Sequence, residues 1–219
     1  MLTIHTAPLL LPGGGLPPLR DGAVAVRGRE IEAVGPYERL AADRPAARIR
    51  RWPGVITPGL LNPHGPELLE RMYHPDPREA AELGTEPLTG DALAALAPDE
   101  VRWGASARRG IQRMLAHGTV AVDGTPRRPA VVDALIRAGL TVLPRPAEPS
   151  GPPSLDPLAG RSPADAFLTP LMPLTPLTVE GGRADFAVFG VADEEDLAAR
   201  GAATCVVTVL AGRLVHRRR

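Results

Sequence analysis

Alternating apolar and polar residues predict β-strands at both ends of the chain. Near the N-terminus, the short apolar runs 22–27 and 30–34 flank a Gly-containing pair, a pattern typical of a β-hairpin. Near the C-terminus, 184–189 is typical of a strand, and 204–210 followed by 213–216 predicts a second hairpin. We therefore expect one β domain that contains strands from both ends of the chain, with an insertion between them.

The middle of the chain predicts alternating helices and strands. Residues 98–116 favour a helix with two acidic residues in its first turn, where the helix dipole stabilises negative charge. Residues 119–123 follow as a buried strand, 129–138 as a second helix and 140–143 as a second strand. This order indicates a parallel α/β arrangement. Between residues 144 and 176 there are ten prolines, which exclude regular helix or central strand there.

Composition excludes several classes of function. The 25 basic and 25 acidic residues give a net charge of zero, so nothing favours binding to nucleic acid or to an anionic membrane. All the basic residues are arginine, which excludes Schiff-base catalysis by lysine, a lysine-containing phosphate loop and a metal pair bridged by a modified lysine. We see no signal peptide and no membrane-spanning apolar run, and the single cysteine, Cys205, fits a cytoplasmic location.

The segment 56–66, Ile-Thr-Pro-Gly-Leu-Leu-Asn-Pro-His-Gly-Pro, resembles the metal-binding strand of the amidohydrolase superfamily. In that family a Pro-Gly turn and a short apolar run lead to Asn-x-His-x-His, and both histidines bind the catalytic metal. Here His64 stands at the first histidine position and Pro66 at the second. Proline has no imidazole, so it cannot replace a ligand.

Segments 21–35, 114–123 and 182–189 extend the resemblance, most closely to imidazolonepropionase and aminodeoxyfutalosine deaminase. The family fold combines a β/α barrel with a composite β-sandwich. The resemblance therefore implies a mixed α+β and α/β fold, in which 1–58 and 177–219 form the composite β-sandwich. Residues 59–176, including the proline-rich connection 144–176, would be a truncated, incomplete β/α-barrel-like insertion.

The resemblance implies a hydrolase of carbon–nitrogen bonds other than peptide bonds, dependent on zinc or iron. The family's later strands supply two more histidine ligands, an aspartate and a catalytic glutamate, and we find no counterpart to these in the sequence. A degenerate metal site would leave the chain without a tightly bound cofactor. The alternative is a non-catalytic binding or accessory protein that keeps the composite β domain.

Three residues are candidates for the site, and no catalytic residue is assigned. His64 is either a relic metal ligand or a histidine that only makes hydrogen bonds at a strand end. His74 could approach His64 in space, although an exposed loop position is the expected alternative. Asp123 closes a buried strand, where it could be functional or could cap the following turn. Elsewhere, we expect His5 and His216 at the surface and Cys205 in the core.

A truncated barrel would leave an unpaired strand edge and an uncovered apolar face. A homodimer is the solution that we favour slightly, and the small-molecule ligand stays unknown. The alternative is that the proline-rich segment covers the opening with its apolar side chains, namely Leu155, Leu158, Phe167, Leu168, Leu171, Met172 and Leu174.

Overall fold

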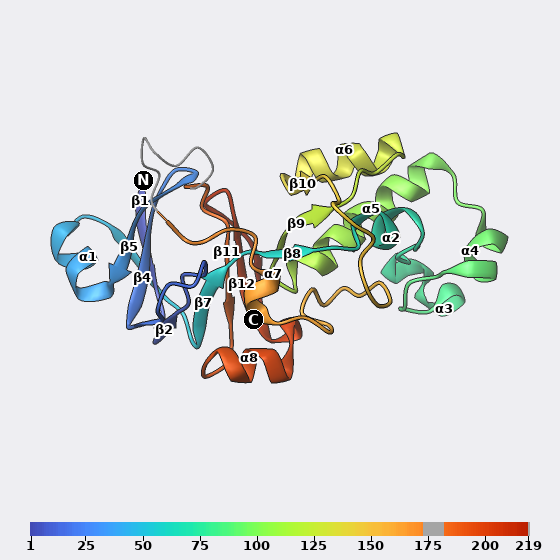
Figure 1. Ribbon diagram of the computed structural model, residues 1–219. Coiled ribbons are helices and arrows are strands. Elements are labelled where there is room, and N and C mark those ends of the chain that lie inside the picture. The colour runs from blue at the N-terminus through green and yellow to red at the C-terminus, as the bar shows by residue number, and fades with distance from the viewer. Residues whose placement is uncertain (173–181, 219) are drawn as a thin grey trace. The chain divides into compact units, whose positions relative to one another are not determined.

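The computed structural model describes residues 1–172 and 182–218, and its architecture is mixed α/β, as the sequence predicts (Figure 1). The chain divides into two compact units. Unit 1 contains Met1–Leu61, Leu115–Val120 and Asp156–Arg219, and unit 2 contains Asn62–Met114 and Ala121–Leu155.

Unit 1 contains two sheets. The first has the order β5 (Glu30–Pro36), β4 (Gly22–Arg27), β1 (Leu2–Thr6), β6 (Arg48–Arg51). The second has the order β13 (Arg213–Arg217), β12 (Cys205–Leu210), β11 (Phe186–Phe189), β7 (Val55–Pro58), β2 (Leu9–Leu10), β3 (Leu19–Arg20). Because β11 pairs antiparallel with β7, strands from both ends of the chain share this sheet.

Apolar side chains from both sheets of unit 1 form a common core. Val24 and Ile31 of the first sheet lie in one buried cluster with Ile56, Phe186 and Val207 of the second. Unit 1 also contains α1 (Tyr37–Asp43), α7 (Pro163–Ala166), α8 (Glu194–Arg200) and the 3-10 helix η2 (Ala202–Thr204).

Two sequence-based expectations concern single residues of this core. Cys205 is buried, as predicted, and burial raises the pKa of its thiol to about 11. The surface position expected for His5 is wrong, because its ring is buried between Trp52 and Phe186. Burial, with the nearby Arg50 charge, lowers the pKa of His5 to about 3.

Unit 2 is built mainly from short helices. They are α2 (Gly65–Glu70), the 3-10 helix η1 (Pro77–Glu79), α3 (Ala80–Leu83), α4 (Gly90–Leu96), α5 (Glu100–Leu115) and α6 (Pro129–Ala138). A sheet with the order β10 (Thr141–Leu143), β9 (Thr119–Asp123), β8 (Leu60–Asn62) accompanies them. β9 and β10 are parallel, in agreement with the expected α/β arrangement. The unit boundary falls within β8 and β9 and at the last residue of α5.

The longest helix, α5, buries one of its faces. Trp103, Ala107 and Ile111 are buried, whereas Val101 and Arg108 are exposed. The buried positions follow each other at intervals of four residues, the spacing of one helix face.

The proline-rich connection is mostly irregular within residues 144–172, but the expectation that prolines exclude a helix there is wrong, because the four-residue helix α7 begins at Pro163, where a proline is tolerated in the first turn. Leu158 and Leu171 pack into the core clusters of unit 1. Of the other side chains proposed to cover an apolar opening, Leu155, Phe167, Leu168 and Met172 are partly buried, and Leu174 lies outside the described residues.

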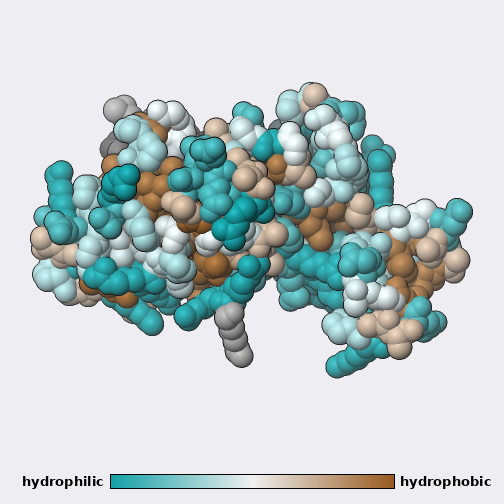
Figure 2. Space-filling model, turned by 90° about the horizontal axis from the view of Figure 1, so that it is seen from below, coloured by the Kyte–Doolittle hydropathy of each residue, from teal (hydrophilic) through white to brown (hydrophobic). Residues whose placement is uncertain are grey.

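Hydrophilic residues cover much of the face shown in Figure 2, with hydrophobic residues in scattered areas. Within the described residues, no helix is long and apolar enough to cross a membrane.

Candidate functional site

The candidate site begins where β8 ends at Asn62, the chain's single asparagine. The buried Asn62 amide makes hydrogen bonds in two directions. Its Nδ2 donates to the Ser154 carbonyl oxygen over 2.9 Å, and its Oδ1 accepts from the His64 backbone N–H, also over 2.9 Å. These bonds fix the turn between β8 and α2, so that His64 becomes the N-cap residue of α2 and is almost fully buried.

The first turn of α2 packs against the end of β9. A Cβ on Gly65 would lie 2.8 Å from the Asp123 carbonyl oxygen, and a Cβ on Gly124 would lie 2.8 Å from the Pro66 ring. Glycine is therefore needed on both sides of this contact. Pro66, which stands where the family has its second histidine, contributes an apolar ring that packs at the strand end.

A guanidinium group lies beside this turn. Arg145, two residues after β10, forms a two-pronged ion pair with Glu67 of α2, with distances of 3.0 Å from Nη1 to Oε1 and 2.6 Å from Nη2 to Oε2. Nη2 also donates to the Pro63 carbonyl oxygen over 2.9 Å. Since Pro63 immediately precedes His64, Arg145 holds a permanent positive charge next to the candidate ligand.

Asp123 also interacts electrostatically with Arg145. The hydrogen bond from Arg145 lowers the pKa of Glu67, and Glu67 raises the pKa of Arg145, with smaller contributions from Glu148 and Asp123. Asp123 is half-buried at the end of β9. The structure therefore places Asp123 and the His64 turn around Arg145, at the ends of the strands.

His74 lies in the loop between α2 and η1, and its contacts are with α5 and α2. The expectation that it is an exposed loop residue is wrong, because it is fully buried. Its Nε2 lies 2.8 Å from the Leu68 carbonyl oxygen, so this nitrogen must carry the proton and donate it. A Cβ on Gly110 would lie 2.7 Å from the His74 ring, which shows how closely the imidazole packs against the helix. Burial lowers the pKa of His74, in accord with a neutral core imidazole.

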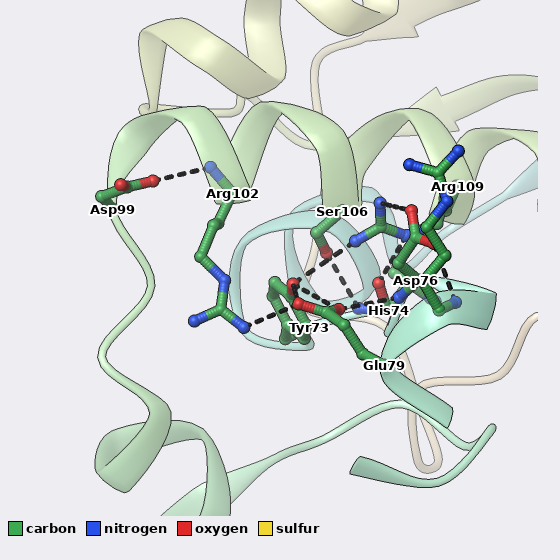
Figure 3. A network of polar contacts seen from close by, with 9 residues as sticks. Tyr73, His74, Asp76, Glu79, Asp99, Arg102, Ser106 and Arg109 are labelled. Carbon is green, nitrogen blue, oxygen red and sulfur yellow. Dashed lines mark hydrogen bonds and ion pairs between the residues drawn. The ribbon is translucent and has the colours of Figure 1, made fainter. Parts of the chain in front are cut away.

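Arginines from α5 extend the contacts of His74 (Figure 3). The His74 backbone N–H donates to Ser106 Oγ over 2.8 Å, and Arg109 Nε donates to the His74 carbonyl oxygen over 2.8 Å. Arg102 forms an ion pair with Glu79 at 2.8 Å. This network joins α5 to the loop and helical turn before it, and its partners explain a structural role for His74.

Comparison with known proteins adds a deaminase relative. No protein-family model matches the chain. Over 44 residues, which are 20% of this chain and 10% of the relative, the chain is 57% identical to 5-methylthioadenosine/S-adenosylhomocysteine deaminase from Syntrophobacter fumaroxidans. The expected resemblance to a deaminase is confirmed over this stretch.

Solved structures similar to this chain include aminofutalosine deaminase from Helicobacter pylori, with a TM-score of 0.44 and 16% identity over 66% of this chain and 33% of that one. Another is an adenosine deaminase from Xanthomonas campestris with bound zinc, with a TM-score of 0.44 and 21% identity over 64% and 33% of the two chains. The chain thus spans a tenth of the curated relative and a third of each structure.

Among the residues that the structure describes, the side chains do not fit a catalytic zinc or iron site. Such a site needs about three protein ligands. Within residues 1–172 and 182–218, no group of three or more His, Cys, Asp or Glu residues could hold a metal ion. Around His64, the second ligand position is Pro66, and Glu67 is bound to Arg145.

Sequence reasoning missed Arg145 and Glu67. Arg145 lies at the start of the proline-rich connection, where the pattern indicated irregular chain without a role. One signal was available, because functional groups in α/β folds gather at the carboxyl ends of parallel strands and Arg145 follows such a strand closely.

Proposed function

We propose that this amidohydrolase-like chain does not hydrolyse carbon–nitrogen bonds by itself and acts as a non-catalytic binding or accessory protein. The observation that carries the proposal is the position of Arg145, whose guanidinium binds the carbonyl of Pro63, next to His64, and the carboxylate of Glu67. A fixed cation stands at the strand ends, beside the residue that resembles a metal ligand.

The charge of Arg145 works against a metal ion in two ways. A guanidinium does not deprotonate in proteins, so it repels a divalent cation at every working pH. It also engages both oxygens of Glu67, so a metal could use that carboxylate only after the ion pair breaks. Arg145 therefore supports the view that structural contacts replace a metal site here. An ion pair occupies the strand ends, and Pro66 occupies the position of the second ligand.

The alternative is that the chain contributes to a carbon–nitrogen hydrolase that needs zinc or iron. The 57% identity with a deaminase over 44 residues favours this alternative. It requires additional ligands from another chain or another part of a longer protein. The two proposals differ in one measurable property, because only the second expects a stoichiometric metal that His64 helps to bind.

Metal content and deamination test the proposal. The protein is incubated with Zn²⁺ or Fe²⁺, dialysed and analysed for metal, and ammonia release is measured with 5-methylthioadenosine and S-adenosylhomocysteine. We expect no stoichiometric metal and no turnover. One equivalent of metal per chain together with turnover, both lost in His64→Ala, would overturn the proposal.

A gain-of-function variant sharpens this test. Pro66→His combined with Arg145→Leu restores the second imidazole and removes the competing cation. We expect this double variant to bind Zn²⁺ more tightly than the natural chain in a competition titration with a chromophoric chelator. Pro66→His alone is the matched control, and equal binding by both variants would show that Arg145 has no influence on metal affinity.

We further propose that unit 1 represents the composite β-sandwich of the family, with 1–58 and 177–219 as its two parts. Pairing of β7 with β11 supports it. If this is right, amides of the two strands should share one cooperative opening step in native-state hydrogen exchange. Separate opening free energies would contradict the proposal.

A homodimer in the cytoplasm is the assembly that we propose. β10 ends the order of its sheet, with Val142 exposed, and Ile136 on α6 is 71% exposed. Apolar groups of this kind favour association. Sedimentation equilibrium at micromolar concentration should give twice the chain mass, and Ile136→Glu should shift the protein to a monomer. A natural chain that sediments as a monomer would exclude the dimer.

A further inference from the structure

Unit 1 has a pocket that is separate from the His64 turn. Its volume is 660 Å³, within the range of about 300–1,000 Å³ that is usual for small-molecule sites. It lies at one end of the four-stranded sheet, where β5, β1 and β6 end and β4 begins. Six of its lining residues carry charged or aromatic groups, namely Arg20, Asp21, Tyr37, Glu38, Arg51 and Trp52.

A contact between Arg51 and Tyr37 crosses the end of this sheet. Arg51 ends β6 and Tyr37 follows β5, and these strands are the two outer strands of the sheet. Arg51 Nη2 donates to the Tyr37 hydroxyl over 2.8 Å, and the guanidinium carbon lies 4.4 Å from the Tyr37 ring centroid. The aromatic ring thus holds the guanidinium in place, and donors of this group other than that bond stay available for an anionic ligand.

Trp52 supplies a second fixed aromatic wall. Its backbone N–H donates to the Thr6 carbonyl oxygen over 2.8 Å, and its indole N–H donates to His5 Nδ1 over 3.1 Å. The chain contains only seven aromatic Phe, Tyr and Trp residues, and two of them line this pocket. Rigid aromatic walls of this kind bind apolar groups with little loss of side-chain entropy.

The pocket combines two charges of each sign. Within the described residues, Arg20, Arg51, Asp21 and Glu38 take part in no ion pair. Asp21 has a positive φ of 47°. Its backbone donates to the Pro8 carbonyl oxygen and accepts from the Tyr37 N–H, both over 2.8 Å. The neighbouring strands therefore fix this unusual backbone conformation, as is common at binding sites.

We propose that this pocket binds a small zwitterion with an apolar side chain. Its carboxylate pairs with Arg51 and Arg20, its ammonium group pairs with Asp21 and Glu38, and its apolar part lies against the aromatic walls. A free amino acid and a short peptide share this chemistry. The balanced charges disfavour a purely anionic or purely cationic ligand, because either would leave two like charges beside it.

Tryptophan fluorescence gives a direct test, because Trp52 and Trp103 are the chain's two tryptophans. In a Trp103→Phe variant, the emission comes from Trp52 in the pocket. We expect saturable quenching or enhancement of the Trp52 emission with L-leucine or the dipeptide Leu-Leu. The compound that binds more tightly shows whether the ligand is a free amino acid or a short peptide. N-acetylleucine lacks the ammonium group and leucinamide lacks the carboxylate, so each should bind at least about tenfold more weakly.

Arg51→Ala should weaken binding of the preferred zwitterion at least about tenfold. Arg48→Ala is the matched control, since Arg48 is exposed on the same strand and does not line the pocket. Circular dichroism confirms that both variants fold, and calorimetry on the natural chain repeats the titration without a substitution. Two results would overturn the proposal: no binding of leucine or Leu-Leu at about 10 mM, or equal binding of the two singly charged analogues.

Discussion

The two units differ in how their segments are joined. In unit 1, apolar clusters join the two sheets, and an ion pair such as Arg200–Asp196 lies at the surface. In unit 2, Arg109 and Arg145 are largely buried, and each contacts segments distant in sequence. Arg109 and Arg145 therefore connect distant segments inside unit 2, whereas Arg200 of unit 1 pairs with a neighbour on its own helix.

Short helices increase the need for such side-chain contacts in unit 2. Strands of unit 1 share ladders of backbone hydrogen bonds with their neighbours. Helices α2, α3 and α4 have at most seven residues, too few for a stable isolated helix. Long side chains that reach backbone carbonyls and carboxylates supply connections that such short elements cannot make through their own backbone.

The largest predicted effect is on the buried ion pair of unit 2. The side chains of Arg145 and Glu67 are 14% and 11% exposed. Arg145→Ala leaves the Glu67 carboxylate buried without its partner, so we expect a loss of about 3 kcal/mol in the free energy of unfolding. Urea unfolding followed by Trp103 fluorescence in a Trp52→Phe background measures this in unit 2.

Two controls separate burial from charge. Arg200→Ala removes an exposed ion pair of unit 1 and should cost about 0.5 kcal/mol or less. Arg145→Met combined with Glu67→Leu removes both charges and should recover most of the lost stability. Equal costs for Arg145→Ala and Arg200→Ala would break the comparison between the units.

A second prediction concerns acid and unit 1. His5 Nδ1 accepts the Trp52 indole N–H, so the folded chain needs the neutral imidazole. The pKa of His5 is lowered from 6.5 to about 3, so between these values the unfolded chain binds the proton and the folded chain does not. The contribution of His5 to the free energy of unfolding is therefore fully present above pH 6.5. It falls as the pH drops toward 3, by about 1 kcal/mol per pH unit.

His5→Asn is the control for this pH dependence. Its side-chain oxygen can accept a hydrogen bond in place of Nδ1, but it does not titrate. The difference in unfolding free energy between the natural chain and this variant should change by about 2 kcal/mol from pH 6 to pH 4. A constant difference over this range would show that His5 does not control the acid sensitivity of unit 1.

The smallest predicted effect has opposite signs at two glycines of α5. A Cβ on Gly110 would overlap the His74 ring, so Gly110→Ala should destabilise unit 2 by about 1–2 kcal/mol. A Cβ on Gly104 would meet its nearest atoms at 3.5 and 3.6 Å, which is ordinary contact. Gly104→Ala should therefore stabilise the helix by up to about 1 kcal/mol. Stabilisation by both substitutions, measured by urea unfolding, would exclude tight packing of His74 against α5.

Sequence patterns predicted the regular elements well where local rules determine structure. The hairpin of β4 and β5 and helix α6 follow from short-range alternation and from Gly139 as a left-handed C-cap residue. Helix α8 was not predicted, although Asp193 caps its first turn and Gly201 follows its end. Both signals are present in the sequence, but only one residue of this short helix, Leu197, is buried.

The candidate site was harder to predict because its contacts are long-range. The motif around His64 indicated the strand end at which the candidate site lies, and the loss of a metal ligand there stays a prediction. Pairing of Arg145 with Glu67 joins residues 78 positions apart, and no local pattern encodes such a pair. His74 was misjudged for the same reason, since its burial depends on Gly110 in a helix far along the chain.

The buried thiol of Cys205 makes this protein convenient to label. Its Sγ lies 3.4 Å from Thr208 Oγ1 inside the core, and its raised pKa leaves almost no thiolate at neutral pH. A maleimide reagent would therefore react very slowly with Cys205 in the folded protein. Arg20→Cys, at an exposed position that lines the pocket of unit 1, would carry a single fluorophore or spin probe without any need to remove Cys205 first.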